Sequence, residues 1–549
     1  MVVKKILILN MTRMGDLIQS TPVIAGLRRQ YPQAHITLVV TSDFAEFSER
    51  IPDIDDRRAF NLRQFEDKKK LKGIMWIELY RYLESFMEEL KSGDYDLLIN
   101  LSHSRFSAFI ISYLGIKNLR GFACNETGDR ITLDPWMQYF GTEPFNRMYN
   151  PFNLVEIFTR SVGAAPEEHP IHIQSIPEDA EAVAEILTRE KIEPGDFIIG
   201  IQAGSSLKGR RWPASAFAEL ADGLMERLGA KIILFGVASE SGLAGEIRSC
   251  VRQEDRVIDL TGKTNISQLL ELVKRCSYLV TNDTGTMHIA AAVGTPIVGL
   301  FFAHAHPFET GPYSPGHLIF QARIPCSPCG YGVECNNIVC VRKVRPQHLL
   351  SMIEIHRKES LWRLPASMGS LEEVNIFQTC IGEDRRLRLQ PLVRHPLTSI
   401  DLFRECYTHL WLDVLGTVPI PGAGSRGIGD RLHIGDRLRE DYDCSNVDEL
   451  LLHIQEKLGA LKELEKLARQ GMRRAEEIVR LCSSRKPGGR TARLQVLAAR
   501  VDSLDDEINQ TGCTHPEVKP ISDMFSKRKE NLQGEDTVRL ARETRVCYQ

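Results

Sequence analysis

The chain has 549 residues, and a prior of about 150 residues per domain suggests three or four structural units. Hydrophobic residues make up 43% of it, which is ample for buried cores, and the net charge of −3 gives no global argument for a nucleic-acid partner. Thirteen cysteines over this length are too sparse for a disulfide framework.

The first ten residues, MVVKKILILN, place only four apolar residues after a charged pair. This run is too short for the core of a signal peptide and is typical of a buried strand. The longest apolar run, Ile289–Ala303, is interrupted by Gly294 and Pro296 and falls short of the roughly 20 residues that span a bilayer. We therefore expect a soluble, cytoplasmic chain.

From residue 1 to about residue 355, short β-branched runs alternate with amphipathic stretches, which is typical of βαβ units and mostly parallel sheets. Two such series flank a segment rich in proline and acid, at about 162–177. The pattern predicts an α/β fold with two domains, at 1–165 and 178–355. They would face a cleft at the carboxyl ends of their sheets, where ligands of open α/β folds bind.

Beyond residue 355 the pattern becomes mainly helical, and we expect a separate extension over 356–510. Val447–Leu481 has apolar residues at three- and four-residue spacing, and the pattern resumes at Thr491–Ile508 after the break SSRKPGGR. These segments predict a helical hairpin over about 447–508. The polar, proline-containing residues 511–549 are expected to form a poorly ordered tail.

The segment NMTRMGDLIQSTP follows the first predicted strand. Gly15 allows a tight turn there, and Asp16 lies just before a helix that continues to about Tyr31. A carboxylate is thereby expected near the mouth of the first sheet. The alternative is that Asp16 only caps the helix.

A second loop, AGSSLKGRRWP, follows a predicted strand of the second series. The hydroxyls of Ser205 and Ser206 could bind phosphate oxygens, and a cation from Lys208, Arg210 or Arg211 could neutralise charge on a leaving diphosphate. A solvated run of charges is the usual alternative. The position of the loop at a strand end favours binding.

The segment TNDTGTMHIAAAVGTP joins the predicted strand SYLVTN to a helix that starts at Gly285, with Thr284 placed to cap it. The free N–H groups and positive dipole of such a helix start suit a phosphate or diphosphate. Asp283 would repel phosphate if it pointed inward, so we expect it to bind a hydroxyl or hold the turn. The alternative is a tight turn with a buried His288.

Four cysteines cluster in PCSPCGYGVECNNIVC with the spacing C-x2-C-x5-C-x4-C. Thiolates at these spacings can satisfy a structural zinc ion, and an iron–sulfur cluster is a related option. A disulfide or redox role and unliganded thiols are the alternatives. His304 and His306 nearby are interpreted as loop residues. The cysteines are Cys326, Cys329, Cys335 and Cys340.

Taken together, MTRMGDLIQSTPVIAGLRRQYP, AGSSLKGRRWPASAFAELA, LTGKT and NDTGTMHIAAAVGTPIVGLF, in this order and spacing, resemble the ADP-heptose:lipopolysaccharide heptosyltransferases of glycosyltransferase family 9. The resemblance covers about residues 1–355. It implies a GT-B fold and inverting, metal-independent transfer of heptose from ADP-heptose to the lipopolysaccharide inner core. No cofactor is expected for the transfer itself.

The resemblance also implies roles for individual residues. Asp16 matches the family's general base, and Glu240 matches an acidic position that binds the adenosine ribose. Arg210 falls where such families usually have lysine, which keeps the charge and changes the hydrogen-bond geometry. The expected donor-binding residues are Gly15, Ser205, Ser206, Lys208, Arg210, Glu240, Asp283, Thr284, Gly285 and His288.

A basic stretch of the first domain corresponds to the family's acceptor side. A basic loop beside aromatic residues would suit an anionic glycolipid, with peripheral contact at the inner membrane surface. A solvated surface is the alternative. The cations are Arg57, Arg58, Arg63, Lys68, Lys69 and Lys70.

Other functions are compatible with the same predicted fold. The same scaffold could transfer another sugar or act on a protein. A degenerate transferase could instead serve as a binding or scaffold protein through its helical C-terminus. Retention of Asp16, the cations and the NDTG segment favours the enzyme.

Overall fold

The computed structural model describes residues 3–66, 74–125, 127–142, 144, 146–366, 368, 371–416, 430–483, 490–532 and 536–549. It divides into two compact units. Unit 1 comprises Met1–Arg120, Phe152–His395 and Gly416–Gly429, and unit 2 comprises Gly121–Pro151, Pro396–Leu415 and Asp430–Gln549.

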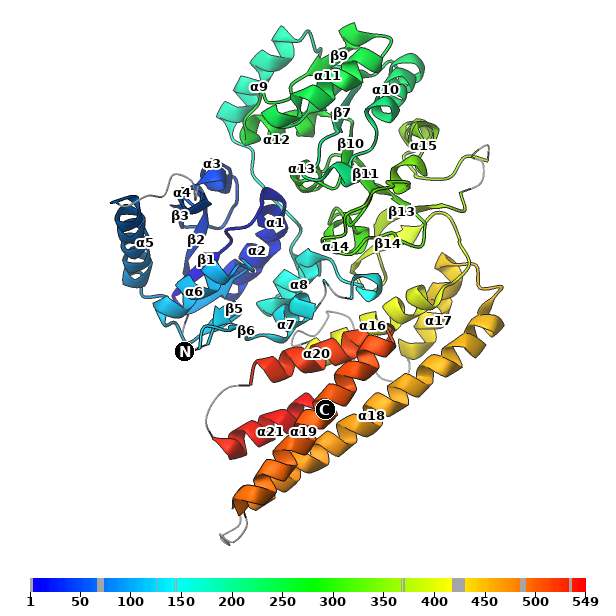
Figure 1. Cartoon of the computed structure of the whole chain (residues 1–549). Coiled ribbons are helices and arrows are strands. Elements are labelled where there is room, and N and C mark those ends of the chain that lie inside the picture. The colour runs from blue at the N-terminus through cyan, green and yellow to red at the C-terminus, as the bar shows by residue number, and fades with distance from the viewer. Residues whose placement is uncertain are drawn as a thin grey trace. The chain divides into compact units, whose positions relative to one another are not determined.

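The first sheet has the strand order β3-β2-β1-β4-β5-β6, and its strands β1 to β4 are parallel (Figure 1). In β1, KILIL, every residue after the first is buried, which is typical of a parallel sheet covered on both faces. The strands are β1 (Lys5–Leu9), β2 (His35–Thr41), β3 (Asp56–Phe60), β4 (Leu97–Asn100), β5 (Leu119–Cys124) and β6 (Arg130–Thr132). The helices of this part of the chain are α1 (Met14–Gln19), α2 (Thr21–Gln30), α3 (Ala45–Ser48), α4 (Arg63–Glu66), α5 (Ile74–Ser92), α6 (Arg105–Leu114) and α8 (Leu154–Ser161), together with α7 (Pro135–Thr142), which belongs to unit 2.

The second sheet has the order β14-β13-β12-β11-β10-β7-β8-β9. It is parallel from β7 (Ile198–Gln202) to β12 (Leu318–Ala322), and the last two strands are antiparallel. The other strands are β8 (Lys231–Phe235), β9 (Val257–Asp259), β10 (Tyr278–Asn282), β11 (Ile297–Phe301), β13 (Val374–Ile381) and β14 (Leu387–Pro391). Its helices are α9 (Pro177–Arg189), α10 (Ala214–Leu228), α11 (Ser241–Cys250), α12 (Ile266–Arg275), α13 (Gly285–Val293), α14 (Pro307–Thr310) and α15 (Pro346–Glu359).

The strands β13 and β14 extend the second domain beyond its expected end at residue 355. We expected a mainly helical extension from residue 356, yet β13 pairs with β12 and β14 pairs with β13, so that these two strands complete the second sheet. The alternating burial of VNIFQTCI is typical of a strand with one face on the core. The second α/β domain therefore continues past the segment that resembles the heptosyltransferases.

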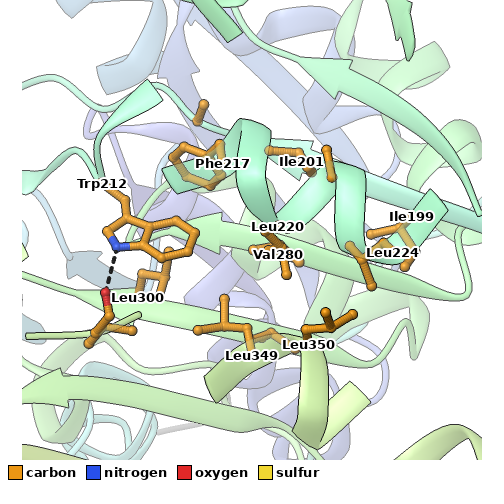
Figure 2. Packing of buried hydrophobic residues seen from close by; sticks show 14 of the residues in the cluster. Ile199, Ile201, Trp212, Phe217, Leu220, Leu224, Val280, Leu300, Leu349 and Leu350 are labelled. Atoms are coloured by element: carbon orange, nitrogen blue, oxygen red, sulfur yellow. Dashed lines mark hydrogen bonds between the residues drawn. The ribbon is translucent and has the colours of Figure 1, made fainter. Parts of the chain in front are cut away.

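The core of the second sheet fixes the AGSSLKGRRWP loop through Trp212. Figure 2 shows this indole beside Phe217, with its N–H bonded to a backbone carbonyl. Trp212 is 1% exposed, and the centroid of its ring lies 5.0 Å from that of Phe217. Its Nε1 donates a hydrogen bond to the carbonyl of Val344 at 3.1 Å. Burial of an indole with its polar N–H satisfied is strongly stabilising, so the loop has a firm anchor.

Unit 2 is built around two long helices, α18 and α19, which pack along each other. The expected disorder of 511–549 is wrong for the residues described there, because they form α20 and α21. Val518, Phe525 and Tyr548 from this segment are buried in one core with residues of α18 and α19. The helices are α16 (Ser399–Leu415), α17 (Asp430–Asp441), α18 (Val447–Ser483), α19 (Arg490–Thr514), α20 (Lys519–Glu530) and α21 (Thr537–Cys547).

Within the described parts of the chain, no helix combines the length and the apolar composition needed to cross a membrane.

Candidate active site

The start of α1, after the first sheet, packs against α13, which follows β10 of the second sheet. The contact depends on two glycines. A Cβ atom at Gly15 would lie 2.9 Å from Cδ2 of His288, and one at Gly285 would lie 2.5 Å from Cε of Met14. Side chains at these positions would push the helices apart, so both glycines permit a close backbone approach. Both are among the residues expected in the donor site.

Asp16 lies one residue after this contact, in the first turn of α1. Burial raises the pKa of its carboxyl above the ordinary value. The hydrogen bond from the Arg13 amide and the charges of His103 and Arg13 oppose the rise, whereas the charge of Asp283 adds to it. A carboxylate with a raised pKa accepts a proton more readily, which suits a general base.

Several buried polar atoms beside α13 have no partner within the described structure. Ser205 is 4% exposed and its Oγ makes no hydrogen bond, and Nε of Arg210 and Nδ1 of His288 are likewise buried and unpaired. Buried polar groups are normally paired, so each unpaired atom needs an explanation.

Arg210 is held at the start of α13 by Asp283. The two side chains form a nearly buried ion pair, and Nη2 of Arg210 also donates to the Asp283 carbonyl at 3.0 Å. Thr310 donates a second hydrogen bond to the Asp283 carboxylate, at 3.2 Å. The negative charge of the Asp283 carboxylate is therefore balanced by Arg210, which reduces the repulsion that a nearby phosphate would otherwise meet.

Thr284 is the N-cap residue of α13, as its position predicted, but its side chain makes no capping bond. Its Oγ1 lies 3.2 Å from Oγ1 of Thr281 instead. The amides of the first turn are therefore not capped by this hydroxyl, and they can face an anion. Burial lowers the pKa of His288 in the same turn to about 4, so this imidazole is neutral at pH 7.

Glu240 comes to the same edge of the second sheet. A Cβ atom at Gly204 would lie 1.9 Å from Oε1 of Glu240, so the carboxylate rests over the loop that carries Ser205. Oε2 of Glu240 accepts hydrogen bonds from Nε2 of Gln202 and from the Val237 amide, both at 3.2 Å. These bonds hold the carboxylate beside the donor-side loop.

Asn282 and Gln202 organise the site and were not predicted from the sequence. Nδ2 of Asn282 donates to the carbonyl of Ala203 at 2.7 Å, and its Oδ1 accepts from the Trp212 amide at 3.3 Å. Gln202 accepts from Thr286 at 3.2 Å. The available signal was a polar residue at the end of each buried strand, where an apolar one would be expected.

Two of the expected donor residues differ in burial from their neighbours on the AGSSLKGRRWP loop. Ser206 and Lys208 are exposed, whereas Ser205 and Arg210 on the same loop are buried. Of these four residues, Arg210 bonds the start of α13, through the carbonyl and carboxylate of Asp283.

The three expected acceptor cations that the structure describes have partners within the chain. The guanidinium of Arg57 donates to the carbonyls of Ser48, Ile51 and Ile54, which ties down the chain around α3. Arg58 pairs with Asp56 and Glu89, and Arg63 pairs with Asp43. The acceptor role expected of these residues stays a prediction. Lys68, Lys69 and Lys70 lie outside the described residues.

The four cysteines line one small cavity of about 30 Å³ beside Gly209. Cys340 is buried, while Cys326 and Cys335 are exposed and Cys329 is half-buried. Among the described residues, no group of three or more His, Cys, Asp or Glu side chains is arranged to hold a metal ion. The expected zinc site is therefore not supported. His306 accepts from the Phe308 amide and caps α14, as a structural loop residue does.

The chain is similar in sequence to known heptosyltransferases. The family model "Glycosyltransferase family 9 (heptosyltransferase)" matches residues 154–336. Lipooligosaccharide heptosyltransferase 2 of Haemophilus influenzae is 28% identical over 303 residues, which are 54% of this chain and 82% of that protein. Lipopolysaccharide heptosyltransferase 2 of Escherichia coli is 25% identical over 60% of this chain and 89% of its own length.

A solved structure agrees in fold. The family 9 glycosyltransferase of Veillonella parvula has a TM-score of 0.53 and 22% identity, over 64% of this chain and 96% of that one. The two Rossmann-like domains are those of the GT-B fold, as the resemblance implied. The helical region of unit 2 lies outside the family match at 154–336. Over its α/β domains, the chain is therefore similar to the heptosyltransferases of glycosyltransferase family 9.

Proposed function

We propose that the α/β domains transfer a heptose from ADP-heptose to a hydroxyl of the lipopolysaccharide inner core, with inversion at the anomeric carbon. The family match and the heptosyltransferase relatives support the reaction class. The observation that carries the proposal is the packing of α1 on α13. It brings the carboxylate of Asp16 to the helix start that would hold the diphosphate.

The donor would bind with its diphosphate at the start of α13. Support comes from the uncapped amides of that helix, from the buried and unpaired Oγ of Ser205, and from the Arg210 guanidinium. Backbone amides and a helix dipole at one point form a ready anion site. Glu240 would accept hydrogen bonds from the ribose hydroxyls at the adjacent strand end.

In the proposed reaction, Asp16 takes the proton from the acceptor hydroxyl as its oxygen attacks the anomeric carbon. The new C–O bond forms on one face while the bond to the diphosphate oxygen breaks on the other, which inverts the centre. ADP leaves with the negative charge, stabilised by Arg210 and the α13 amides. In this scheme the charge of the leaving group is neutralised by protein groups, and neither the transfer nor the site requires zinc.

The acceptor would be a glycolipid, so the enzyme would work at the cytoplasmic face of the inner membrane. The first sheet's domain would contact the acceptor, because Asp16 belongs to that domain. Another glycan or a protein acceptor would use the same donor site.

The test measures ADP released from ADP-heptose with a heptose-deficient core acceptor. We expect Asp16→Asn to lose turnover by at least about a hundredfold, as loss of a general base implies, while binding of ADP-heptose persists. Asp53→Asn is the matched control, because Asp53 is exposed and its φ of 65° suits asparagine. Donor binding without turnover in the wild type, across several acceptors, would favour the scaffold alternative.

A further inference from the structure

The helical unit 2 contains a cavity of about 290 Å³ between α16, α18, α19, α20 and the end of α21. Its volume is at the lower end of ligand pockets. A dry apolar cavity of about 150 Å³ already holds a benzene molecule, so this one is large enough for an apolar ligand. The cavity lies outside the region that resembles the heptosyltransferases.

The walls of the cavity are apolar. Trp411, Leu464 and Phe525 are each less than 9% exposed and form its inner part. Leu410 and Val414 also line it, yet they are 36% and 47% exposed. The cavity therefore leads from a solvent-accessible apolar edge into the core of the helices, a shape that suits a chain with one apolar end.

Arg528 gives this apolar wall a positive charge. Burial lowers the pKa of its guanidinium, and the thiol of Cys547 opposes this effect. Within the described part of the chain, the Arg528 side chain makes no hydrogen bond or ion pair. The other charged residue of the lining, Glu465, is already paired with Arg469 at 2.6 Å. The lining of the cavity thus contains one partly buried cation, Arg528, that forms no ion pair with a described residue.

We propose that this cavity binds a long-chain fatty carboxylate, with the acyl chain among Trp411, Leu464 and Phe525 and the carboxylate on Arg528. The apolar walls favour burial of methylene groups. A guanidinium has the planar fork that matches a carboxylate with two parallel hydrogen bonds. A partly desolvated cation attracts an anion more strongly than a solvated one does, because the local dielectric is lower.

The first test titrates the full chain with dodecanoate in a calorimeter, below the concentration at which the probe forms micelles. We expect saturable binding, and Arg528→Gln should weaken it at least tenfold. Arg539→Gln is the matched control, since Arg539 is an exposed cation of α21 that pairs with Glu543. It should bind as the wild type does. Dodecyltrimethylammonium, which has the same chain and the opposite charge, should bind more weakly than dodecanoate.

A second test locates the site. Ala468 lines the cavity, so Ala468→Phe should fill it and abolish binding while thermal unfolding shows that the chain still folds. No saturable binding of dodecanoate to the wild type, or binding that both variants leave unchanged, would overturn the proposal. Equal affinity for the cationic probe would also overturn it.

Discussion

Arg210 and Asp283 form a nearly buried ion pair that joins the loop after β7 to the start of α13. Arg210 would hold the diphosphate, so the donor must share this guanidinium with Asp283. The pairing also keeps the cation in place before the donor arrives, and a preorganised charge is more effective than one that must move.

Replacing Arg210 should weaken donor binding and slow the transfer. A charge-assisted hydrogen bond contributes about 1.5–3 kcal/mol, so we expect Arg210→Met to lower kcat/KM by roughly 10- to 100-fold. Arg210→Lys should have a smaller effect, because the charge remains. Steady-state kinetics with varied ADP-heptose measure this. Arg227→Met, at an exposed position of α10, is the control and should change little.

The glycine at position 15 should be needed for activity. In Gly15→Ala the new Cβ would lie 2.9 Å from His288, so α1 must shift and carry Asp16 with it. A displacement of about 1 Å can reduce a rate by about a hundredfold, so we expect turnover in this variant to slow by roughly 10- to 100-fold in steady-state assays. Gly195→Ala has no neighbour within 4 Å of the added atom and should keep full activity. Normal turnover in Gly15→Ala would contradict the proposed contact.

The pH profile should report the environment of Asp16. Because burial raises the pKa of its carboxyl, the acidic limb of kcat/KM should lie above the ordinary carboxyl value of about 4. The positive charge of His103 lowers this pKa, so His103→Gln should move the limb to higher pH. A substitution of His453, an exposed residue of α18, should leave the limb unchanged. A shift to lower pH in His103→Gln would contradict this assignment.

The buried pair of Arg386 and Glu156 should be important for stability. Arg386, between β13 and β14, bonds both carboxylate oxygens of Glu156 in α8, at 2.8 and 3.1 Å. Removing one partner of a buried ion pair typically costs about 3–5 kcal/mol, because a charge is left unpaired. We therefore expect Arg386→Met to lower the free energy of unfolding by about this amount in denaturant titrations. The double variant with Glu156→Leu should recover part of the loss.

The sequence revealed the loops of the site because their signals are local. Small residues, hydroxyls and cations follow buried strands, and parallel topology brings such strand ends to one edge. The contacts that each side chain makes could not be predicted in this way, because they depend on residues elsewhere in the fold. Arg57 and Arg63 looked alike in the sequence, yet Arg57 binds three carbonyls and Arg63 pairs with Asp43.

Features that depend on contacts between distant parts of the chain could not be predicted from the local sequence pattern either. The pairing of β13 with β12 joins residues more than fifty positions apart, and nothing in VNIFQTCI alone identifies its neighbour. The helices α20 and α21 were missed because their segment is polar. Its few apolar residues, such as Val518 and Tyr548, are the ones buried against other helices. Burial in a tertiary core can outweigh weak local periodicity.

The two antiparallel strands at the end of the second sheet have a practical consequence for dissecting this enzyme. Cutting the chain after residue 355 would remove β13 and leave β12 as a bare edge, with its backbone N–H and C=O groups open to pairing with other molecules. The same cut would remove Arg386 and leave the buried carboxylate of Glu156 without its ion-pair partner. A minimal transferase fragment should therefore aggregate unless it continues through residue 391.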